Sequence, residues 1–395
     1  MSTTRMSTVC ASRACRSTRR PLRAFAMLLT IAALGVHAAV LSHAAVLSHA
    51  ATFALAAAAA PGAADKTAIP RDFDFLIGDW QVHHRRIMAD TKEWAQFEGT
   101  MTHYNVMAGA ANVDENVLHS PRGVYPAVSL RAWDPKAQQW AIWWLDGRYP
   151  SGPLGSPVKG TFENGVGTFF ADYEQDGKPM RVRFLWSDIT PTSARWQQAS
   201  SADSGKTWQT NWIMTFTRAE ASTPPPARVG AMSDGSSVSP AAFDDFAFLA
   251  GDWRVHHRYL RTRGDKPEWA QATGTVRNQS MLGSWVNSDD TVLNAASGSY
   301  RALALRSYDA KEGQWAIWWL DGRDPSGALD PPMQGRFENG VGTFFGTTTF
   351  DGKRTPVRFI WSKITPRSAQ WEQAYSFDDR KTWETNWIME FVRDR

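Results

Sequence analysis

The sequence predicts an all-β protein made of two tandem antiparallel up-and-down β-barrels, with about ten strands in each barrel. After residue 64, aromatic and β-branched residues dominate runs of about 5–10 residues, and turn-forming residues separate these runs. No window of 12 residues shows a helical period of apolar residues. The whole pattern then occurs a second time, which indicates two copies of one domain.

The duplication is visible in long matching segments. Residues 78–85 return, with one substitution, as residues 251–258, and residues 139–148 return unchanged as residues 314–323. The offset between the copies is therefore 173 to 175 residues. Solenoid and propeller units repeat about every 20–50 residues, so this much longer period indicates two whole domains.

These observations divide the chain into four parts. We expect the first barrel over residues 72–218 and the second over residues 243–393. Residues 219–242 are rich in Pro, Ser, Gly and Ala and predict a flexible linker. Residues 1–64 predict a signal peptide followed by an Ala-rich segment.

The export prediction depends on charge and length. Residues 1–23 carry positive charge, and the apolar run over residues 24–36 is too short to span a bilayer but typical of a signal peptide. We expect this segment to be removed, no stable membrane anchor to remain, and the protein to be periplasmic or secreted. A retained membrane anchor is the alternative.

Removing this segment changes the composition. The chain has a formal charge of +4, but six arginines and both cysteines, Cys10 and Cys15, precede residue 65. The remainder has 37 basic and 39 acidic residues and no cysteine. That composition excludes a disulfide scaffold, a Cys-ligated metal site and a thiol nucleophile. It also removes the positive charge that nucleic-acid binding requires, so we expect no nucleic-acid partner. We also expect no cofactor.

Turn signals locate the strands of the first domain. Asn164-Gly165 and Asp176-Gly177 are typical two-residue hairpin turns. A β-sandwich usually needs long crossovers, for which the sequence offers no segment, so a barrel is favoured. The ten strands are expected near residues 80–87, 94–105, 111–118, 125–133, 139–146, 158–162, 166–173, 180–187, 193–200 and 207–217.

The ends of each domain carry a family resemblance. A Gly-x-Trp motif opens the first strand at Trp80 and an arginine, Arg218, closes the last strand; Trp253 and Arg393 repeat the pair. This pattern resembles the calycin superfamily of lipocalins and fatty-acid-binding proteins, and a family of uncharacterised bacterial exported proteins with a calycin-like barrel. The resemblance implies a ligand-holding barrel closed at one end by the arginine packed over the tryptophan. It names no substrate.

One histidine in each copy is a candidate functional residue. Because side chains alternate along a strand, His84 shares a face with Trp80, and His257 shares a face with Trp253. Each is either a partly buried cavity residue or a catalytic base tunable near neutral pH. The neighbouring His83 points to the other face, so the two cannot hold one ion without a bulge, and we expect no metal site.

Twenty tryptophans divide evenly, ten to each domain. They either fill the barrels or line a pocket for an apolar or aromatic ligand. Arg183 could anchor a ligand carboxylate inside the barrel or lie outside it, and Asp146 with Arg148 forms either a local turn pair or a polar rim. The candidate ligand-binding residues are the repeated side chains His84, Trp144, Asp146, Arg148, Arg183, Gln198 and Trp212, and His257, Trp319, Asp321, Arg323, Arg358, Gln373 and Trp387.

Residues 201–208 resemble the Asp-box of sialidase propellers. A propeller carries such a box on several blades, each blade within about 50 residues, whereas this chain has one box per 175 residues. Here the second copy departs from the pattern, with Arg380 where glycine belongs. The segment therefore predicts a hairpin turn rather than a catalytic element.

Together these features favour an exported tandem-barrel binding protein that holds a small apolar or aromatic ligand in Trp-lined cavities. We expect it to act as a monomer whose two domains form a covalent pseudo-dimer. One alternative is a barrel enzyme, an isomerase, cyclase or hydrolase, with His84 and His257 as bases. The other is a structural pseudo-dimer with barrels plugged by their own side chains.

Overall fold

The computed structural model describes residues 68–220, 243–264 and 266–393. The expected signal peptide and nearly all of the expected linker lie outside these residues. Within the described ranges, no helix has the length and apolar character needed to cross a bilayer.

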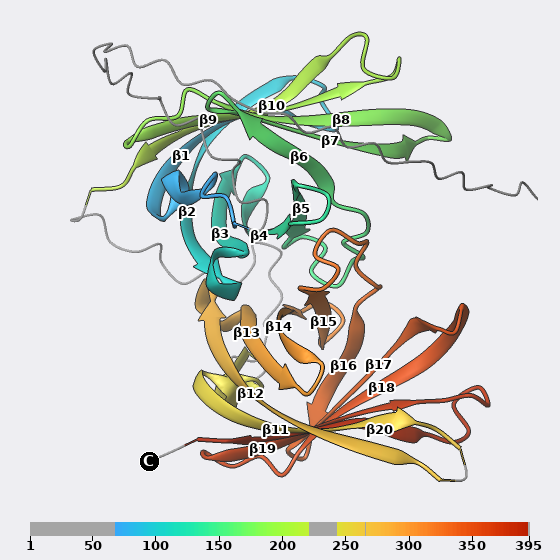
Figure 1. The fold of residues 1–395 in the computed structure, drawn as a ribbon. Coiled ribbons are helices and arrows are strands. Elements are labelled where there is room, and N and C mark those ends of the chain that lie inside the picture. The colour runs from blue at the N-terminus through green and yellow to red at the C-terminus, as the bar shows by residue number, and fades with distance from the viewer. Residues whose placement is uncertain (1–67, 221–242, 265, 394–395) are drawn as a thin grey trace, which may run out of the picture. The chain divides into compact units, whose positions relative to one another are not determined.

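Ten antiparallel strands close the first barrel, barrel 1, coloured blue to green in Figure 1. Each strand pairs with the next along the chain, and the first also pairs with the last, so the barrel has no free edge. The strands are β1 (Gly78–Ile87), β2 (Trp94–Val106), β3 (Ala111–Ser120), β4 (Gly123–Asp134), β5 (Gln139–Asp146), β6 (Val158–Glu163), β7 (Val166–Gln175), β8 (Lys178–Ser187), β9 (Ser193–Ser201) and β10 (Gln209–Arg218).

The second barrel, barrel 2, repeats this arrangement in yellow to red in Figure 1. Its first strand again pairs with both its second and its last strand. The strands are β11 (Gly251–Thr262), β12 (Glu268–Met281), β13 (Val286–Ala295), β14 (Gly298–Asp309), β15 (Gln314–Asp321), β16 (Met333–Glu338), β17 (Val341–Phe350), β18 (Lys353–Ser362), β19 (Ser368–Tyr375) and β20 (Glu384–Val392).

The prediction of two ten-stranded up-and-down barrels is confirmed. Every predicted strand of barrel 1 is present, with ends within two residues of the prediction. Strand β1 shows why: Trp80, Val82 and His84 are buried, whereas Gln81 and Arg85 between and beyond them are exposed. One face of each strand supplies the interior and the other meets solvent, as a half-buried strand requires.

A short 3₁₀ helix before the first strand plugs one end of each barrel. In barrel 1, Phe73 precedes η1 (Asp74–Leu76), and its ring packs edge-on against Trp140 and Phe162 with centroids 5.1 and 5.0 Å apart. In barrel 2, Phe246 precedes η4 (Ala247–Leu249) and contacts Trp315 at 5.0 Å. Edge-to-face aromatic contacts of this kind add to the stabilisation from apolar burial.

The described residues, from residue 68 onward, belong to one compact unit, and reciprocal hydrogen bonds join its two barrels. The backbone N–H of Met107 donates to Asp290 at 2.8 Å, and the equivalent N–H of Leu282 donates to Glu115, the counterpart of Asp290, at 2.7 Å. Such reciprocity is typical of an isologous contact between two copies. Two serine–aspartate bonds repeat it, Ser151 to Asp309 and Ser326 to Asp134. One apolar cluster contains Val113, Leu130 and Trp143 together with Val286, Leu305 and Trp318.

Candidate functional site

Each barrel contains a cavity, and equivalent positions line the two cavities. The barrel 2 cavity has a volume of about 330 Å³ and the barrel 1 cavity about 120 Å³. The shared lining positions are Asp114/Asp289, Asn116/Thr291, Ser129/Ala304, Arg131/Arg306, Ile142/Ile317, Trp143/Trp318, Trp144/Trp319, Phe184/Phe359, Trp186/Trp361, Trp196/Trp371, Gln198/Gln373, Trp212/Trp387, Met214/Met389 and Phe216/Phe391.

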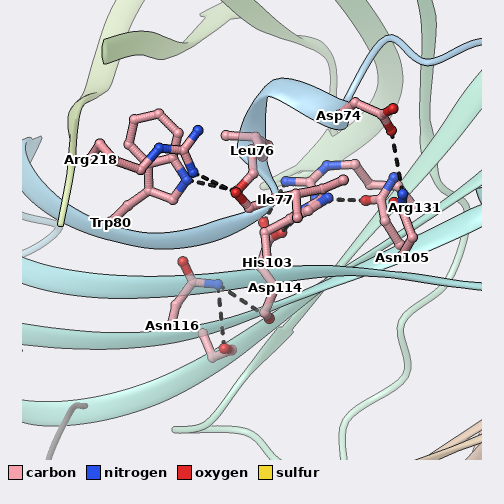
Figure 2. Close-up of polar contacts among 12 residues, drawn as sticks. Asp74, Leu76, Ile77, Trp80, His103, Asn105, Asp114, Asn116, Arg131 and Arg218 are labelled. Atoms are coloured by element: carbon pink, nitrogen blue, oxygen red, sulfur yellow. Dashed lines mark hydrogen bonds and ion pairs between the residues drawn. The ribbon is translucent and has the colours of Figure 1, made fainter. Parts of the chain in front are cut away.

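A buried ion pair forms the polar part of the barrel 1 cavity. The Arg131 guanidinium donates to both carboxylate oxygens of Asp114, at 2.9 and 2.6 Å, and the two side chains are 4% and 2% exposed. His103 on β2 bonds the same carboxylate, as Figure 2 shows. Burial by itself would raise the pKa of Asp114, but the charges of Arg131 and His103 outweigh it and hold that pKa well below its usual range.

Barrel 2 keeps this pair with one partner changed. Arg306 pairs with Asp289, and both side chains are about 5% exposed or less. Asn278 stands where barrel 1 has His103, and its amide donates to Asp289 at 2.6 Å. A carboxylate and a guanidinium removed from water stabilise each other, because an unpaired buried charge costs several kcal/mol.

The sequence analysis missed these two pairs. The arginines lie on the buried parts of β4 and β14, and both copies retain them together with their aspartates. A charged residue repeated on the inward face of a buried strand was the available signal.

His84 and His257 lie inside their barrels but line neither cavity. The indole N–H of Trp212 donates to Nδ1 of His84 at 3.2 Å, and Trp387 donates to Nδ1 of His257 at 3.3 Å. These bonds occupy the Nδ1 lone pair and assign the proton to Nε2 in the neutral ring. Gly99 faces the His84 ring, and a Cβ there would lie 2.7 Å from its Nε2.

The surroundings of these histidines oppose protonation. Burial lowers the pKa of His84 to about 3, helped by the positive charge of Arg86. Burial lowers the pKa of His257 to about 4. Both rings are therefore neutral at pH 7, and with Nδ1 bonded and no cavity contact they show no access to a ligand. On the described residues, nothing favours the barrel-enzyme alternative over the others.

Arg183 and Arg358 lie on the outer faces of their barrels. On β8 and β18 they alternate with Phe184 and Phe359, which line the cavities. Their guanidinium groups stack on outward tryptophans, at 4.6 Å from Trp208 and 4.8 Å from Trp383. Of the two placements left open by the sequence, the structure has the outer one, so neither arginine can anchor a carboxylate inside.

The Asp-Gly-Arg turns form local ion pairs in both barrels. The Arg148 guanidinium bonds Asp146 at 2.9 and 2.6 Å and lies 4.3 Å from the centroid of Tyr125. Arg323 bonds Asp321 in the same way, with Nε 2.9 Å from the carboxylate. Only Asp321 lines a cavity.

The barrel closures consist of an arginine on a tryptophan. The Arg218 guanidinium lies 3.9 Å from the centroid of Trp80 and donates to the carbonyl of Phe75. The Trp80 indole donates to the carbonyl of Leu76 at 2.7 Å (Figure 2). Arg393 lies 3.8 Å from Trp253. These cation–π contacts and carbonyl bonds fasten the plugging helix to the last strand.

The segment that resembles an Asp-box forms the predicted hairpin turn. Residues 201–208 form a hairpin turn in which Asp203 accepts from the backbone and hydroxyl of Thr207, at 2.9 and 2.7 Å. Within the described ranges, no group of three or more His, Cys, Asp or Glu residues is arranged to hold a metal ion.

Comparison with known proteins gives only distant likenesses. No family model matches the sequence, and no curated protein matches it. An S-type phycobiliprotein lyase from Guillardia theta is 11% identical, with 38% of this chain and 91% of that chain covered and a TM-score of 0.26. A protein of unknown function from the DUF3598 family of Nostoc punctiforme is 10% identical, with 82% and 98% covered and a TM-score of 0.23. At these scores the likenesses carry no argument about function.

Proposed function

We propose that the protein binds a small apolar or aromatic ligand in a calycin-like barrel, and that barrel 2 is the binding barrel. The barrel 2 cavity of about 330 Å³ carries this proposal. Its volume falls within the range of ligand pockets, about 300–1,000 Å³.

The wall of this cavity suits such a ligand. Trp371 and Trp387 pack edge-to-face with centroids 5.6 Å apart, and Trp319 packs on Trp387 in the same way at 6.4 Å. Rings held by their neighbours lose little entropy when a ligand packs on them, which favours binding. Trp319 is 38% exposed, so this part of the wall reaches the surface and offers an entrance. Gln373 and Tyr375 add polar groups that could orient a ligand.

Barrel 1 suits a supporting role. Its cavity of about 120 Å³ is smaller than the roughly 150 Å³ that holds one benzene molecule in a known case. Phe97 stacks on His84 at 4.7 Å in this barrel, whereas barrel 2 has Ala272 at the equivalent position. The protein thus combines one open and one nearly filled barrel.

The setting in which it binds is also a proposal. The charge and length of residues 1–64 support export, and we place the protein in the periplasm or outside the cell. The reciprocal hydrogen bonds between the barrels support a monomer built as a covalent pseudo-dimer. Detection of the processed chain in a periplasmic or culture fraction tests the location.

The binding test uses N-phenyl-1-naphthylamine, a neutral probe whose fluorescence rises in apolar surroundings. We expect one saturable site per chain. Ala304 lines the barrel 2 cavity, so Ala304→Phe should lower the affinity at least tenfold by filling the space. The matched variant Ser129→Phe at the equivalent position of barrel 1 should change the affinity less than twofold. The milder Ala304→Leu covers the case in which either larger variant fails to fold.

Two outcomes would overturn the proposal. One is the absence of saturable probe binding to the folded protein. The other is unchanged probe affinity in both Ala304 variants, with native circular dichroism.

A further inference from the structure

The mouth of the barrel 2 cavity carries acidic residues that barrel 1 lacks. Asp324 and Asp330 lie in the segment between β15 and β16 and line the cavity, and both are exposed. The equivalent positions of barrel 1 are Tyr149 and Gly155. The two cavities, alike in most of their lining, therefore differ in charge.

The charges that line barrel 2 do not cancel. Asp289 is paired with Arg306 deep in the cavity, and Asp321 is paired with Arg323. Asp330 accepts a bond from the hydroxyl of Thr348, and no ion pair involves Asp324 or Asp330 within the described ranges. Two carboxylates at the mouth thus have no cationic partner among the described residues, and no lysine lines the cavity. In barrel 1 the lining charges are Asp114 and Arg131 alone, which cancel.

The same cavity presents aromatic faces and an unused donor. The half-exposed ring of Trp319 lines the cavity together with the acids at the mouth, and a cation placed over such a ring is attracted to its face. Trp361 also lines the cavity and is 2% exposed, and its indole Nε1 has no hydrogen-bond partner within the described part of the chain. A buried N–H without a partner is costly, and an acceptor atom on the apolar body of a ligand would satisfy it.

We propose that barrel 2 selects organic cations: amines or quaternary ammonium compounds whose apolar body packs on the tryptophans while the charge stays beside Asp324 and Asp330. This inference rests on the proposed binding function and narrows it. It disfavours fatty acids and other carboxylates, which the two uncompensated acids repel. Because these acids are exposed, the selectivity weakens as salt concentration rises.

The test compares three probes with one apolar body: 4-phenylbutylamine, 4-phenylbutanol and 4-phenylbutyrate. Each displaces N-phenyl-1-naphthylamine from the full protein at pH 7. We expect the amine to bind at least tenfold more tightly than the carboxylate, with the alcohol between them. The double variant Asp324→Asn with Asp330→Asn should weaken the amine three- to tenfold and leave the alcohol within twofold. Raising the salt from 50 to 500 mM should reduce the advantage of the amine.

A matched control removes one acid elsewhere. Asp176→Asn lies in a hairpin turn of barrel 1, outside either cavity, and should change no probe's affinity more than twofold. If the alcohol competes as well as the amine, or if the double variant leaves the amine unchanged, the inference is overturned while ligand binding stands. If the reporter binds but the amine does not displace it, the inference is overturned as well. If the reporter itself fails to bind, the proposed function fails.

Discussion

Barrels 1 and 2 share strand order, plug, closure and the buried Arg–Asp pair, but their cavities differ almost threefold in volume. Two buried inward positions carry a clearly larger residue in barrel 1: Phe97 stands against Ala272, and Met101 stands against Val276. Residues repeated in both barrels thus form the strands, the plug and the closure, and residues that differ between the barrels affect the cavity volume.

The polar interior shows a second difference. In barrel 1 the buried carboxylate of Asp114 contacts both Arg131 and the imidazole of His103. In barrel 2 the carboxylate of Asp289 contacts Arg306 and the neutral Asn278. Barrel 1 therefore has a second group that can compensate its carboxylate, and barrel 2 has none.

The largest expected effect is loss of the buried arginine. We predict that Arg131→Met and Arg306→Met each lower the free energy of unfolding by about 3–5 kcal/mol, because each leaves a buried carboxylate without its main partner. The loss should be larger for Arg306→Met, because Asp114 retains His103 whereas Asp289 retains only the amide of Asn278. Urea unfolding at pH 7 measures both.

A second substitution separates charge from packing. Adding Asp289→Leu to Arg306→Met removes the unpaired charge and should recover most of the stability. An equal or smaller loss for Arg306→Met than for Arg131→Met would contradict the proposed difference between the barrels.

The next effect concerns cavity size. Phe97 is 7% exposed and stacks on His84, so Phe97→Ala should cost about 3 kcal/mol and enlarge the interior of barrel 1. The reverse change, Ala272→Phe, should cost only about 1 kcal/mol, because His257 has no ring stacked on it at this position. Denaturant unfolding and crystal structures of both variants check the prediction. Similar costs for the two changes would show that Phe97 does not set the difference.

An effect smaller than the loss of the buried arginine is a pH dependence from His84 and His257. Their pKa values in the folded protein are lowered to about 3 and about 4, so below pH 6.5 the unfolded chain binds more protons than the folded one. The stabilisation that the two neutral histidines give the folded protein is therefore present above pH 6.5 and is lost as the pH falls below it. Between pH 7 and pH 5 the loss should be about 2 kcal/mol for each histidine.

Glutamine variants isolate this effect, because the side-chain oxygen of glutamine can still accept from the tryptophan. His84→Gln and His257→Gln should each remove about half of the loss measured by urea unfolding at pH 7 and pH 5. The contribution of barrel 1 should extend to lower pH, because barrel 1 has Arg86 where barrel 2 has Tyr259. A loss that persists in the double variant would place its origin elsewhere.

Most of the fold followed from local patterns. The alternation around Trp80, Val82 and His84 specifies one buried face, and the Asn-Gly and Asp-Gly turns specify where each hairpin reverses. Pairing with the nearest strand in sequence needs no further information, which is why the strand boundaries agree so closely. The second barrel repeats the strand order of the first, which supports the same assignments in both copies.

The candidate site was harder to predict, because the sequence of one strand does not indicate which side chains of other strands its residues contact. Asp114 and Arg131 are 17 residues apart on neighbouring strands and pair directly. Arg183 and Phe184 are adjacent, yet only Phe184 reaches the cavity. The side that each repeated polar residue takes depends on bulges such as the one between Thr210 and Trp212, which periodicity does not reveal.

The sequence by itself determined two all-β domains, their strands and their closing arginines, because hydrophobic alternation and turn chemistry act within a few residues. Only the tertiary structure decided which side chains share the interior, which acids reach the mouth of barrel 2, and how much space remains. Cavity volume is what is left after residues from all ten strands have packed, so no local pattern contains it.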